Sequence, residues 1–314
     1  MNRSAGTVAP PQTPDVMVLG GGGILGEAWM SSLLAGIEDS RTFSAGACDV
    51  YLGTSAGSIV AAMLCAGVDL RCRLGELPEQ PPAEVPGAGS GTPSAGARVL
   101  RAASSAAEAA ARPLASIALR GAAPGGRMLR RAALSRVPQG RRSLGELGRE
   151  IARSGAAWDG RLRITAVELE SGSRVIFDGS GGPAVSVAQA VEASCAIPGV
   201  FRPLEVDGRR YVDGGAWSPT NMDVVEVSRG TRVLCLNPTG ALKPTVLGPA
   251  GALGTVSRSL AAIEAAALRR RGAEVTIVEP DRECMEAIGP NLMNPGRREQ
   301  VVAAGFAQGR RAAI

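Results

Sequence analysis

The chain has 314 residues, of which 45% are apolar and 3% aromatic, and it contains no histidine. Its length and apolar content allow the core of one large domain or two small ones, and no stretch reaches the roughly 18 consecutive apolar residues of a membrane-spanning helix. Without histidine and without clustered cysteines, a transition-metal site is not expected, and no other cofactor is expected either.

The six cysteines are scattered, and most of them lie in apolar contexts such as AAMLCAG and RVLCLN. This pattern indicates buried thiols in a reducing compartment, while a set of disulfides remains the alternative. The N-terminal stretch MNRSAGTVAPPQTPD lacks the apolar run of a secretory signal. A cytoplasmic protein is therefore expected, with peripheral contact to a membrane as a variant of that expectation.

Positive charge is concentrated in one part of the chain. The net charge is +5, and the interval from Arg98 to Arg153 contains twelve arginines against three glutamates. Because aromatic residues that could stack on bases are scarce, nucleic acid is not an expected partner. An anionic lipid surface is the better candidate for this interval, and a solvated basic face is the alternative. The sequence has no signature of an oligomeric state.

Strand-to-helix transitions dominate the N-terminal part of the chain. Residues 1–14 are polar and Pro-rich and are expected to form a disordered tail. An apolar strand at 16–19 runs into four glycines and then into a helical pattern that ends near Asp39. A second strand at about 49–52 runs into Ser55, and the helix that follows is apolar on nearly every side and should be buried.

Pro, Gly, Ala and Ser dominate the next part of the chain, as in PEQPPAEVPGAGSGTPSAGA. Large apolar residues are too few in this part to build a separate core. We therefore expect a flexible Pro/Gly/Ala/Arg-rich insertion at about 78–140, carried by a single domain that spans residues 15–310.

The remaining chain alternates strands with helices. Two hairpins are indicated, one around Glu170–Gly172 and one with an Asp-Gly turn at 207–208. The expected elements are helices near 143–154 and 185–194, strands near 161–169, 173–177, 203–212, 231–237 and 273–280, an Ala-rich helix between the last two strands, and a final helix from about 296. This alternation predicts a three-layer α/β/α fold with a mostly parallel central sheet.

The glycine-rich loop GGGGILG, residues 20–26, lies between a strand and a helix. A dinucleotide-binding loop of this kind needs an acidic residue at the end of the second strand, where this chain has GTS at 53–55. A second interpretation is an oxyanion hole, in which the backbone N–H groups of Gly21, Gly22 and Gly23 point at a developing negative charge. A tight turn without chemistry is the third.

The pentapeptide GTSAG at 53–57 has the pattern of a nucleophile elbow. In such a turn the serine adopts a strained backbone conformation, and the residues two positions away on each side must be very small. Ser55 is therefore the candidate nucleophile, with Gly53 and Gly57 as the small residues. The alternative is a glycine-rich turn in which Ser55 or Ser58 caps the following helix.

Ser55 needs a base, and the chain has no histidine to supply one. The one lysine, Lys243, lies in a Pro-flanked loop, which leaves a carboxylate. In RRYVDGGAWSP, Asp213 stands at the end of a hairpin strand, and Gly214 and Gly215 after it leave room for another loop to approach. A partly desolvated Asp213 would have a raised pKa and act as a general base. A solvated acid in a second tight turn is the alternative.

Four blocks, in this order, resemble the patatin-like phospholipase family: GGGILG at 21–26, GTSAG at 53–57, ASCAIPGVFRPL at 193–204 and DGG at 213–215. The later segment NLMNPGRREQVVAAGFAQGR is also similar to segments of bacterial members. The resemblance implies a patatin-like fold and a Ser–Asp dyad in place of a triad.

The resemblance also implies a role for each matched residue. Ser55 attacks the ester carbonyl and becomes acylated, and Asp213 accepts its proton and later activates the water that releases the acyl group. The N–H groups of Gly22 and Gly23, with that of Ala56, hold the oxyanion. The segment 193–203 helps to shape the acyl pocket. The motif glycines are Gly26, Gly53, Gly57, Gly214 and Gly215.

The expected function is that of a serine acyl hydrolase, which cleaves carboxylic esters of lipids or phospholipids through an acyl-enzyme. An acyltransferase would use the same acyl-enzyme with an acceptor other than water, and a non-catalytic lipid-binding protein would keep only the fold. Acyl chain length, head group, positional preference and biological pathway have no signature in the sequence.

Overall fold

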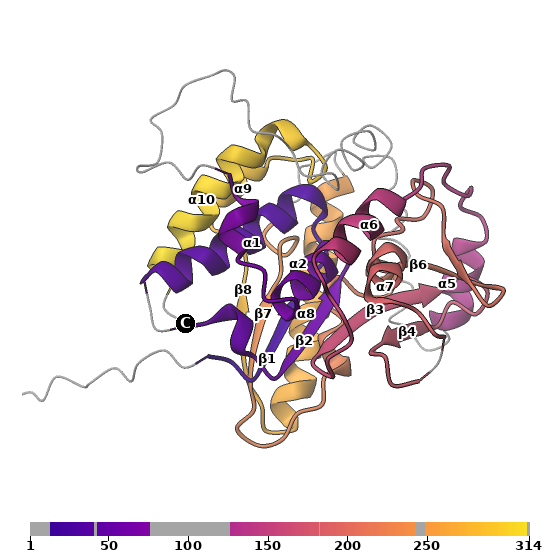
Figure 1. The fold of residues 1–314 in the computed structure, drawn as a ribbon, viewed down its shortest axis with the longest axis horizontal. Helices are drawn as coiled ribbons and strands as arrows, with labels where there is room; N and C mark the ends of the chain where they lie inside the picture. Colours follow the sequence, from indigo (N-terminus) through magenta and orange to yellow (C-terminus); the bar gives the residue numbers. More distant parts are fainter. Residues whose placement is uncertain (1–12, 41–42, 76–125, 182, 243–248, 313–314) are drawn as a thin grey trace, which may run out of the picture.

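The computed structural model describes residues 13–40, 43–75, 126–181, 183–242 and 249–312 (Figure 1). The expected tail lies outside the described residues except for its last two positions, and so does the expected insertion up to residue 125. Lys243 also lies outside them. Among the helices that the structure describes, none has the length and apolar character needed to cross a lipid bilayer.

One sheet organises the described chain. Its strands lie in the order β5, β6, β3, β2, β1, β7, β8, and β4 pairs with β3 in addition. The parallel strands are β1 (Val16–Leu19), β2 (Val50–Thr54), β3 (Leu162–Glu168), β7 (Arg232–Leu236) and β8 (Glu274–Val278). The antiparallel strands are β4 (Arg174–Phe177), β5 (Leu204–Val206) and β6 (Arg209–Asp213). The predicted mostly parallel sheet is thus confirmed.

The central strand β1 is buried along its whole length and contributes to two cores. Met17 and Leu19 belong to the larger apolar cluster, whereas Val16 and Val18 belong to a second one. Because successive strand residues point to opposite faces of a sheet, both faces must be covered. This explains why VMVL is a continuous apolar run instead of an alternating one.

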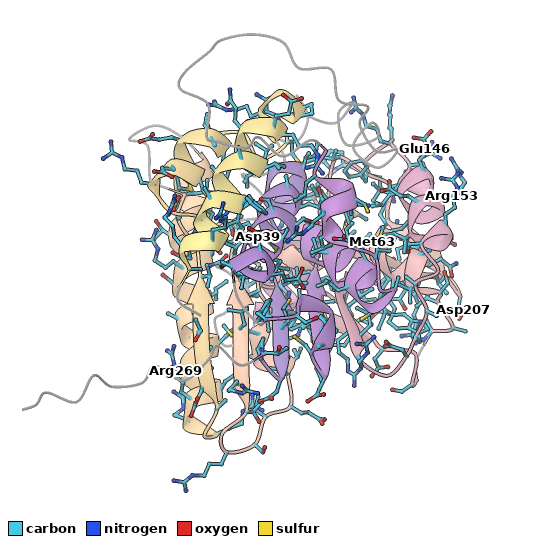
Figure 2. The ribbon with its side chains drawn as sticks, turned by 60° about the vertical axis from the view of Figure 1, so that its left-hand side comes forward. Asp39, Met63, Glu146, Arg153, Asp207 and Arg269 are labelled. Atoms are coloured by element: carbon cyan, nitrogen blue, oxygen red, sulfur yellow. The ribbon has the colours of Figure 1, made fainter. Side chains whose placement is uncertain are left out.

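Helices cover both faces, which confirms the predicted three layers. The larger cluster contains buried residues of α1 (Gly23–Ser40), α2 (Ala56–Cys65), α6 (Gly145–Arg153), α7 (Val187–Ser194), α9 (Arg282–Ile288) and α10 (Arg298–Arg311). Figure 1 shows α10 beside α1 on this face. The second cluster contains residues of α8 (Pro249–Arg270). In Figure 2, Met63 of α2 lies inside the molecule, whereas Arg153 and Arg269 lie at its periphery.

Strand β3 explains how two distant segments meet. The middle of β3 pairs with β4 along one edge. Along its other edge, β2 pairs in parallel up to Thr54, which lies beside Thr165, and β6 pairs from the opposite direction up to Asp213, which lies beside Ala166. The carboxyl ends of β2 and β6 therefore meet head to head. Since Ser55 follows β2 directly, the sheet topology brings Ser55 and Asp213 together.

The last part of the expected insertion is structured. Residues 126–140 include helix α5 (Gly126–Leu134), in which Arg130 and Leu134 are buried. Leu134 belongs to a small apolar cluster with Val167 of β3 and Val212 of β6. The composition does not predict this helix, because an arginine occupies a buried position where an apolar residue would mark the core-facing stripe.

Candidate active site

Ser55 occupies the turn between β2 and α2 in a backbone conformation that residues other than glycine rarely adopt. Its φ is 52° and its ψ is −121°, so the surrounding structure must hold it under strain. A Cβ on Gly53 would lie 2.4 Å from the Cα of Ser58, and a Cβ on Gly57 would lie 1.9 Å from the carbonyl oxygen of Leu19. Only glycine fits at both positions, as an elbow requires.

The hydroxyl of Ser55 faces a carboxylate. Its Oγ donates a hydrogen bond of 2.7 Å to Oδ2 of Asp213, the last residue of β6. The other carboxylate oxygen, Oδ1, accepts a hydrogen bond of 2.7 Å from the N–H of Gly215. Ser55 is 8% exposed and Asp213 is 2% exposed, so the carboxylate is shielded from water while the serine keeps a small accessible area. The candidate nucleophile and the candidate base are in direct contact.

Burial controls the protonation of Asp213. Removal from water raises its pKa from the usual 3.8 to about 6, and the hydrogen bonds from Ser55 and Gly215 oppose this rise. A carboxyl group with such a pKa is still ionised at neutral pH and is a stronger base than an exposed aspartate. The alternative of a solvated acid in a tight turn does not hold, because the side chain is buried.

The glycine loop lies beside the serine, since a Cβ on Gly21 would lie 3.5 Å from the Cβ of Ser55. The N–H of Gly21 already donates to the carbonyl oxygen of Pro219 at 2.9 Å. Gly21 is therefore, contrary to expectation, not a free oxyanion donor. The dinucleotide interpretation needs an acidic residue at the carboxyl end of β2, and neither candidate lies there. Asp49 precedes β2 at the end opposite to Ser55, and Asp39 lies in the last turn of α1.

Three other N–H groups remain available as oxyanion donors. Within the described chain, the N–H groups of Gly22, Gly23 and Ala56 have no hydrogen-bond acceptor. Gly23 and Ala56 are the first residues of α1 and α2, where N–H groups and the helix dipole both favour negative charge. A Cβ on Gly22 would lie 2.6 Å from the Cβ of Pro238, and a Cβ on Gly26 would lie 3.1 Å from the same atom. Close packing on Pro238 thus explains these two motif glycines.

The segment 193–204 touches both members of the pair. The Oγ of Ser194 accepts a hydrogen bond of 2.8 Å from the N–H of Ser55, and the carbonyl oxygen of Ala196 accepts one of 3.0 Å from the N–H of Asp213. The resemblance implies that residues 193–203 shape an acyl pocket, which stays a prediction; the structure shows that this segment holds the backbone of both residues. No local pattern marks Ser194 for this contact, because its partner is 139 positions away.

A buried arginine anchors α5 to the loop that follows Asp213. Arg130 donates from Nε to the carbonyl oxygen of Ala216 at 3.2 Å and from Nη1 to that of Gly172 at 2.9 Å. Its guanidinium carbon lies 3.8 Å from the centre of the Trp217 ring, within the range of a cation–π contact. Burial lowers the pKa of Arg130 to about 10, so the side chain is still charged at neutral pH. No local sequence pattern marks Arg130 for this role.

Neither a metal site nor a set of disulfides has support in the described residues. They contain no group of three or more His, Cys, Asp or Glu side chains that could hold a metal ion. All six cysteines are described, and all are free thiols, which contradicts the alternative of a disulfide set.

A strand–serine–helix turn within a three-layer α/β/α fold is the arrangement of hydrolases with a nucleophile elbow. Residues 93–225 match the family model described as patatin-like phospholipase, a range that begins after Ser55 and includes Asp213. This match covers less than half of the chain; it confirms the resemblance to the patatin-like phospholipase family and supports lipid acyl hydrolysis in general terms. A solved structure, the crystal structure of VipD from Legionella pneumophila, is similar at 13% identity and a TM-score of 0.40, over 96% of this chain and 67% of that one.

Proposed function

We propose that this protein is a serine acyl hydrolase that cleaves carboxylic esters of lipids or phospholipids through a Ser55–Asp213 dyad. One observation carries the proposal, the buried 2.7 Å hydrogen bond from Ser55 Oγ to Asp213 Oδ2. A serine hydroxyl is a weak nucleophile until a positioned base takes its proton. The family supports the general activity, and this hydrogen bond supports the particular pair of residues.

The reaction uses two displacements and one acyl-enzyme. Asp213 accepts the hydroxyl proton while Ser55 Oγ attacks the ester carbonyl carbon, and the ester C–O bond then breaks as the leaving alcohol takes the proton from Asp213. A water molecule next gives a proton to Asp213 and attacks the acyl carbon. The bond to Ser55 Oγ breaks, the fatty acid leaves, and the proton returns to the serine. Each of the two displacements therefore begins with Asp213 ionised.

Negative charge on the carbonyl oxygen develops twice in this sequence, once in each displacement. The N–H groups of Gly22, Gly23 and Ala56 are the proposed donors to this oxygen. They belong to the backbone and therefore need no reorganisation during the reaction. Loss of one such donor in other hydrolases costs about 10²- to 10³-fold in kcat, which is the scale that we expect here.

We further propose that helix α5 contacts an anionic lipid surface. Met128 and Leu129 are 76% and 49% exposed, and they are two of the four large apolar side chains that are exposed in the described residues. Arg127 and Arg131 flank them and are exposed as well. Apolar side chains bordered by arginines bind the interface of an anionic bilayer through burial and charge together. Arg130 anchors α5 to the loop that follows Asp213. Binding of α5 to a bilayer would therefore bring lipid to the side of the molecule that carries this loop.

A panel of esters tests the proposed activity. Wild type and Ser55→Ala are compared on short-chain nitrophenyl esters, a triacylglycerol, and phosphatidylcholine and phosphatidylglycerol vesicles. We expect hydrolysis by the wild type and a loss of about 10³-fold or more in Ser55→Ala. A lysolipid or glycerol acceptor added to the same assay distinguishes acyl transfer from hydrolysis. A folded wild type that cleaves none of these esters would contradict the proposal.

The compartment is also a proposal. The free thiols favour a reducing environment, so we propose that the protein works in the cytoplasm, where it meets the membrane from the inner side. Expression of a tagged chain with fractionation into soluble and membrane-associated material tests this assignment.

A further inference from the structure

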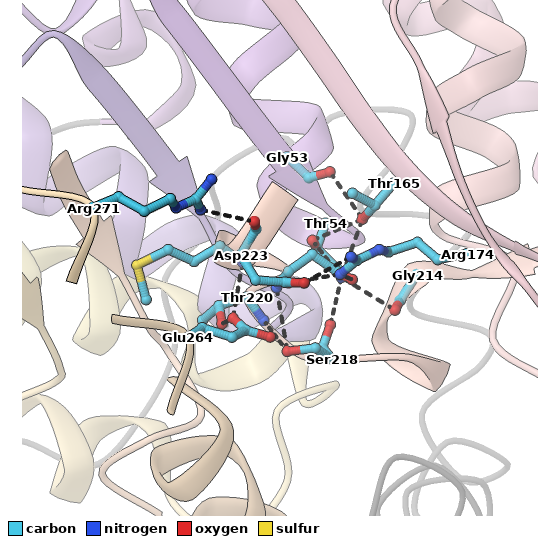
Figure 3. Close-up of polar contacts among 12 residues, drawn as sticks. Gly53, Thr54, Thr165, Arg174, Gly214, Ser218, Thr220, Asp223, Glu264 and Arg271 are labelled. Carbon is cyan, nitrogen blue, oxygen red and sulfur yellow. Dashed lines mark hydrogen bonds and ion pairs between the residues drawn. The ribbon is translucent and has the colours of Figure 1, made fainter. Parts of the chain in front are cut away.

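Asn221 is a fully buried amide in the loop that follows Asp213. Its backbone is left-handed, with φ 50° and ψ 24°, a conformation that asparagine tolerates better than most residues. Both the nitrogen and the oxygen of its side-chain amide form hydrogen bonds. Figure 3 shows the polar groups that gather here, among them Thr54, Thr165 and Ser218. This amide stands at the junction of the two segments that carry the proposed dyad.

One set of contacts leads to the nucleophile. Nδ2 of Asn221 lies 3.1 Å from Oγ1 of Thr54 and 3.3 Å from Oγ1 of Thr165. The two threonine hydroxyls are 2.9 Å apart, and the Thr165 hydroxyl also donates to the carbonyl oxygen of Gly53 at 3.4 Å. Because Thr54 directly precedes Ser55, this cluster holds the end of β2 from which the strained serine turn begins.

A second set of contacts leads to the base. The same Nδ2 donates to the carbonyl oxygen of Ser218 at 2.6 Å and lies 3.3 Å from that of Gly214, so its two N–H groups are shared among the two threonine hydroxyls and these two carbonyl oxygens. Gly214 directly follows Asp213 and has no room for a side chain, because its Cβ would lie 2.5 Å from Oγ1 of Thr165. One amide nitrogen therefore joins the residue before the nucleophile to the residue after the base.

Charged groups fix which way the amide points. Nη1 of Arg174 donates to Oδ1 of Asn221 at 3.2 Å, and two guanidinium nitrogens of Arg174 bind Asp223 at 2.7 and 2.8 Å. Glu264 of α8 accepts hydrogen bonds from both chain neighbours of Asn221, including one of 2.5 Å from the Thr220 hydroxyl. The amide oxygen thus faces an arginine, and the nitrogen faces the two segments of the dyad.

We propose that Asn221 is a positioning residue that sets the separation between Ser55 and Asp213. The inference rests on the proposed function, since it concerns the same proton transfer. Without the amide nitrogen, the ends of β2 and β6 lose a buried side chain that binds both. Misplacement of a catalytic pair by a fraction of an ångström to one ångström is enough to lower a rate by up to about 10²-fold.

Two substitutions test the contribution of the Asn221 side-chain amide to the rate. Asn221→Gly keeps the left-handed backbone and removes the side chain, whereas Asn221→Asp keeps the shape and replaces the donating nitrogen by a carboxylate oxygen. On a soluble short-chain ester, each should lower kcat by about 10- to 100-fold and leave KM within about twofold. Leu268→Ala is the control, because it creates a cavity in the second core under α8 and should lower Tm without lowering kcat at 25 °C.

A double-mutant cycle separates positioning from a general role in the fold. The rate at which a fluorophosphonate labels Ser55 is measured with and without Asn221→Gly, in the wild-type and the Asp213→Asn backgrounds. Positioning through the dyad predicts a loss of about tenfold or more in the first background and less than about threefold in the second. Equal losses in the two backgrounds, or a folded Asn221→Gly with unchanged kcat, would overturn the proposal. A wild type that is not labelled at all would instead overturn the dyad.

Discussion

Ser55 Oγ and Asp213 Oδ2 lie 2.7 Å apart although 158 positions separate the two residues in the chain. The contact follows from the sheet, in which β2 and β6 run toward each other along one edge of β3, so that their carboxyl ends meet. A hairpin strand can therefore bring a carboxylate to the serine, the place where many serine hydrolases have a histidine, in a chain that has no histidine.

Activity should fall in acid as Asp213 becomes protonated. A protonated carboxyl group cannot accept the Ser55 proton, and burial raises the pKa of Asp213 to about 6. The kcat/KM for a soluble ester should therefore rise about tenfold per pH unit below this value and level off above it. A profile that stays flat through the whole acidic range in which the protein is folded would exclude Asp213 as the base.

The same titration should change the stability of the protein in the direction opposite to activity. As the pH rises, activity increases and the free energy of unfolding decreases. Because the folded-state pKa of Asp213 is raised above its usual 3.8, this group contributes stability that is fully present below that pH and lost as the pH rises through about 6. Asp213→Asn removes this dependence. The Tm of the variant relative to wild type should therefore increase over this pH range, and a difference in Tm that stays constant with pH would contradict the burial of an ionised carboxylate.

The glycines of the elbow should tolerate no side chain. A Cβ at position 57 would overlap the carbonyl oxygen of Leu19, so Gly57→Ala should lower the free energy of unfolding by about 1–3 kcal/mol or more. Gly46→Ala is the matched control, because no atom lies within 4 Å of its added Cβ. Chemical denaturation of the two variants measures both values. Equal stability would mean that α2 does not approach β1 as closely as described.

The proposed lipid contact of α5 predicts a loss of vesicle binding when its apolar pair becomes acidic. Met128→Glu with Leu129→Glu should lower binding to phosphatidylglycerol vesicles by about tenfold or more, because it removes apolar burial and adds charge repulsion. Ile263→Glu is the control, since this side chain is 63% exposed on α8. Hydrolysis of a soluble ester should be unchanged in both. If the α5 variant sediments with vesicles as the wild type does, the contact lies elsewhere.

The strands and the elbow could be predicted because their signals are local. An apolar run marks β1, and an Asp-Gly turn marks the hairpin that ends at Asp213. Two helices could not be predicted in this way. In α5 an arginine is buried at a core position, and α9 has only seven residues, too few to show a helical period. In both, tertiary contacts outweigh the hydrophobic pattern.

The residues that hold the site together have no local signal. Ser194 reaches Ser55 across 139 positions, and Asn221 reaches Thr54 across 167. A run of glycines likewise does not reveal that the Gly21 N–H is already bound to Pro219. These contacts depend on how the strands are ordered in the sheet, which sequence patterns alone do not specify.

The rate of fluorophosphonate labelling at pH 8 tests the dyad most directly. Ser55→Ala should not be labelled, and Asp213→Asn should be labelled about 10²- to 10⁴-fold more slowly than wild type. Asp207→Asn, an exposed change in the turn of the same hairpin, should be labelled at the wild-type rate. A folded Asp213→Asn protein that reacts as fast as wild type would contradict the account.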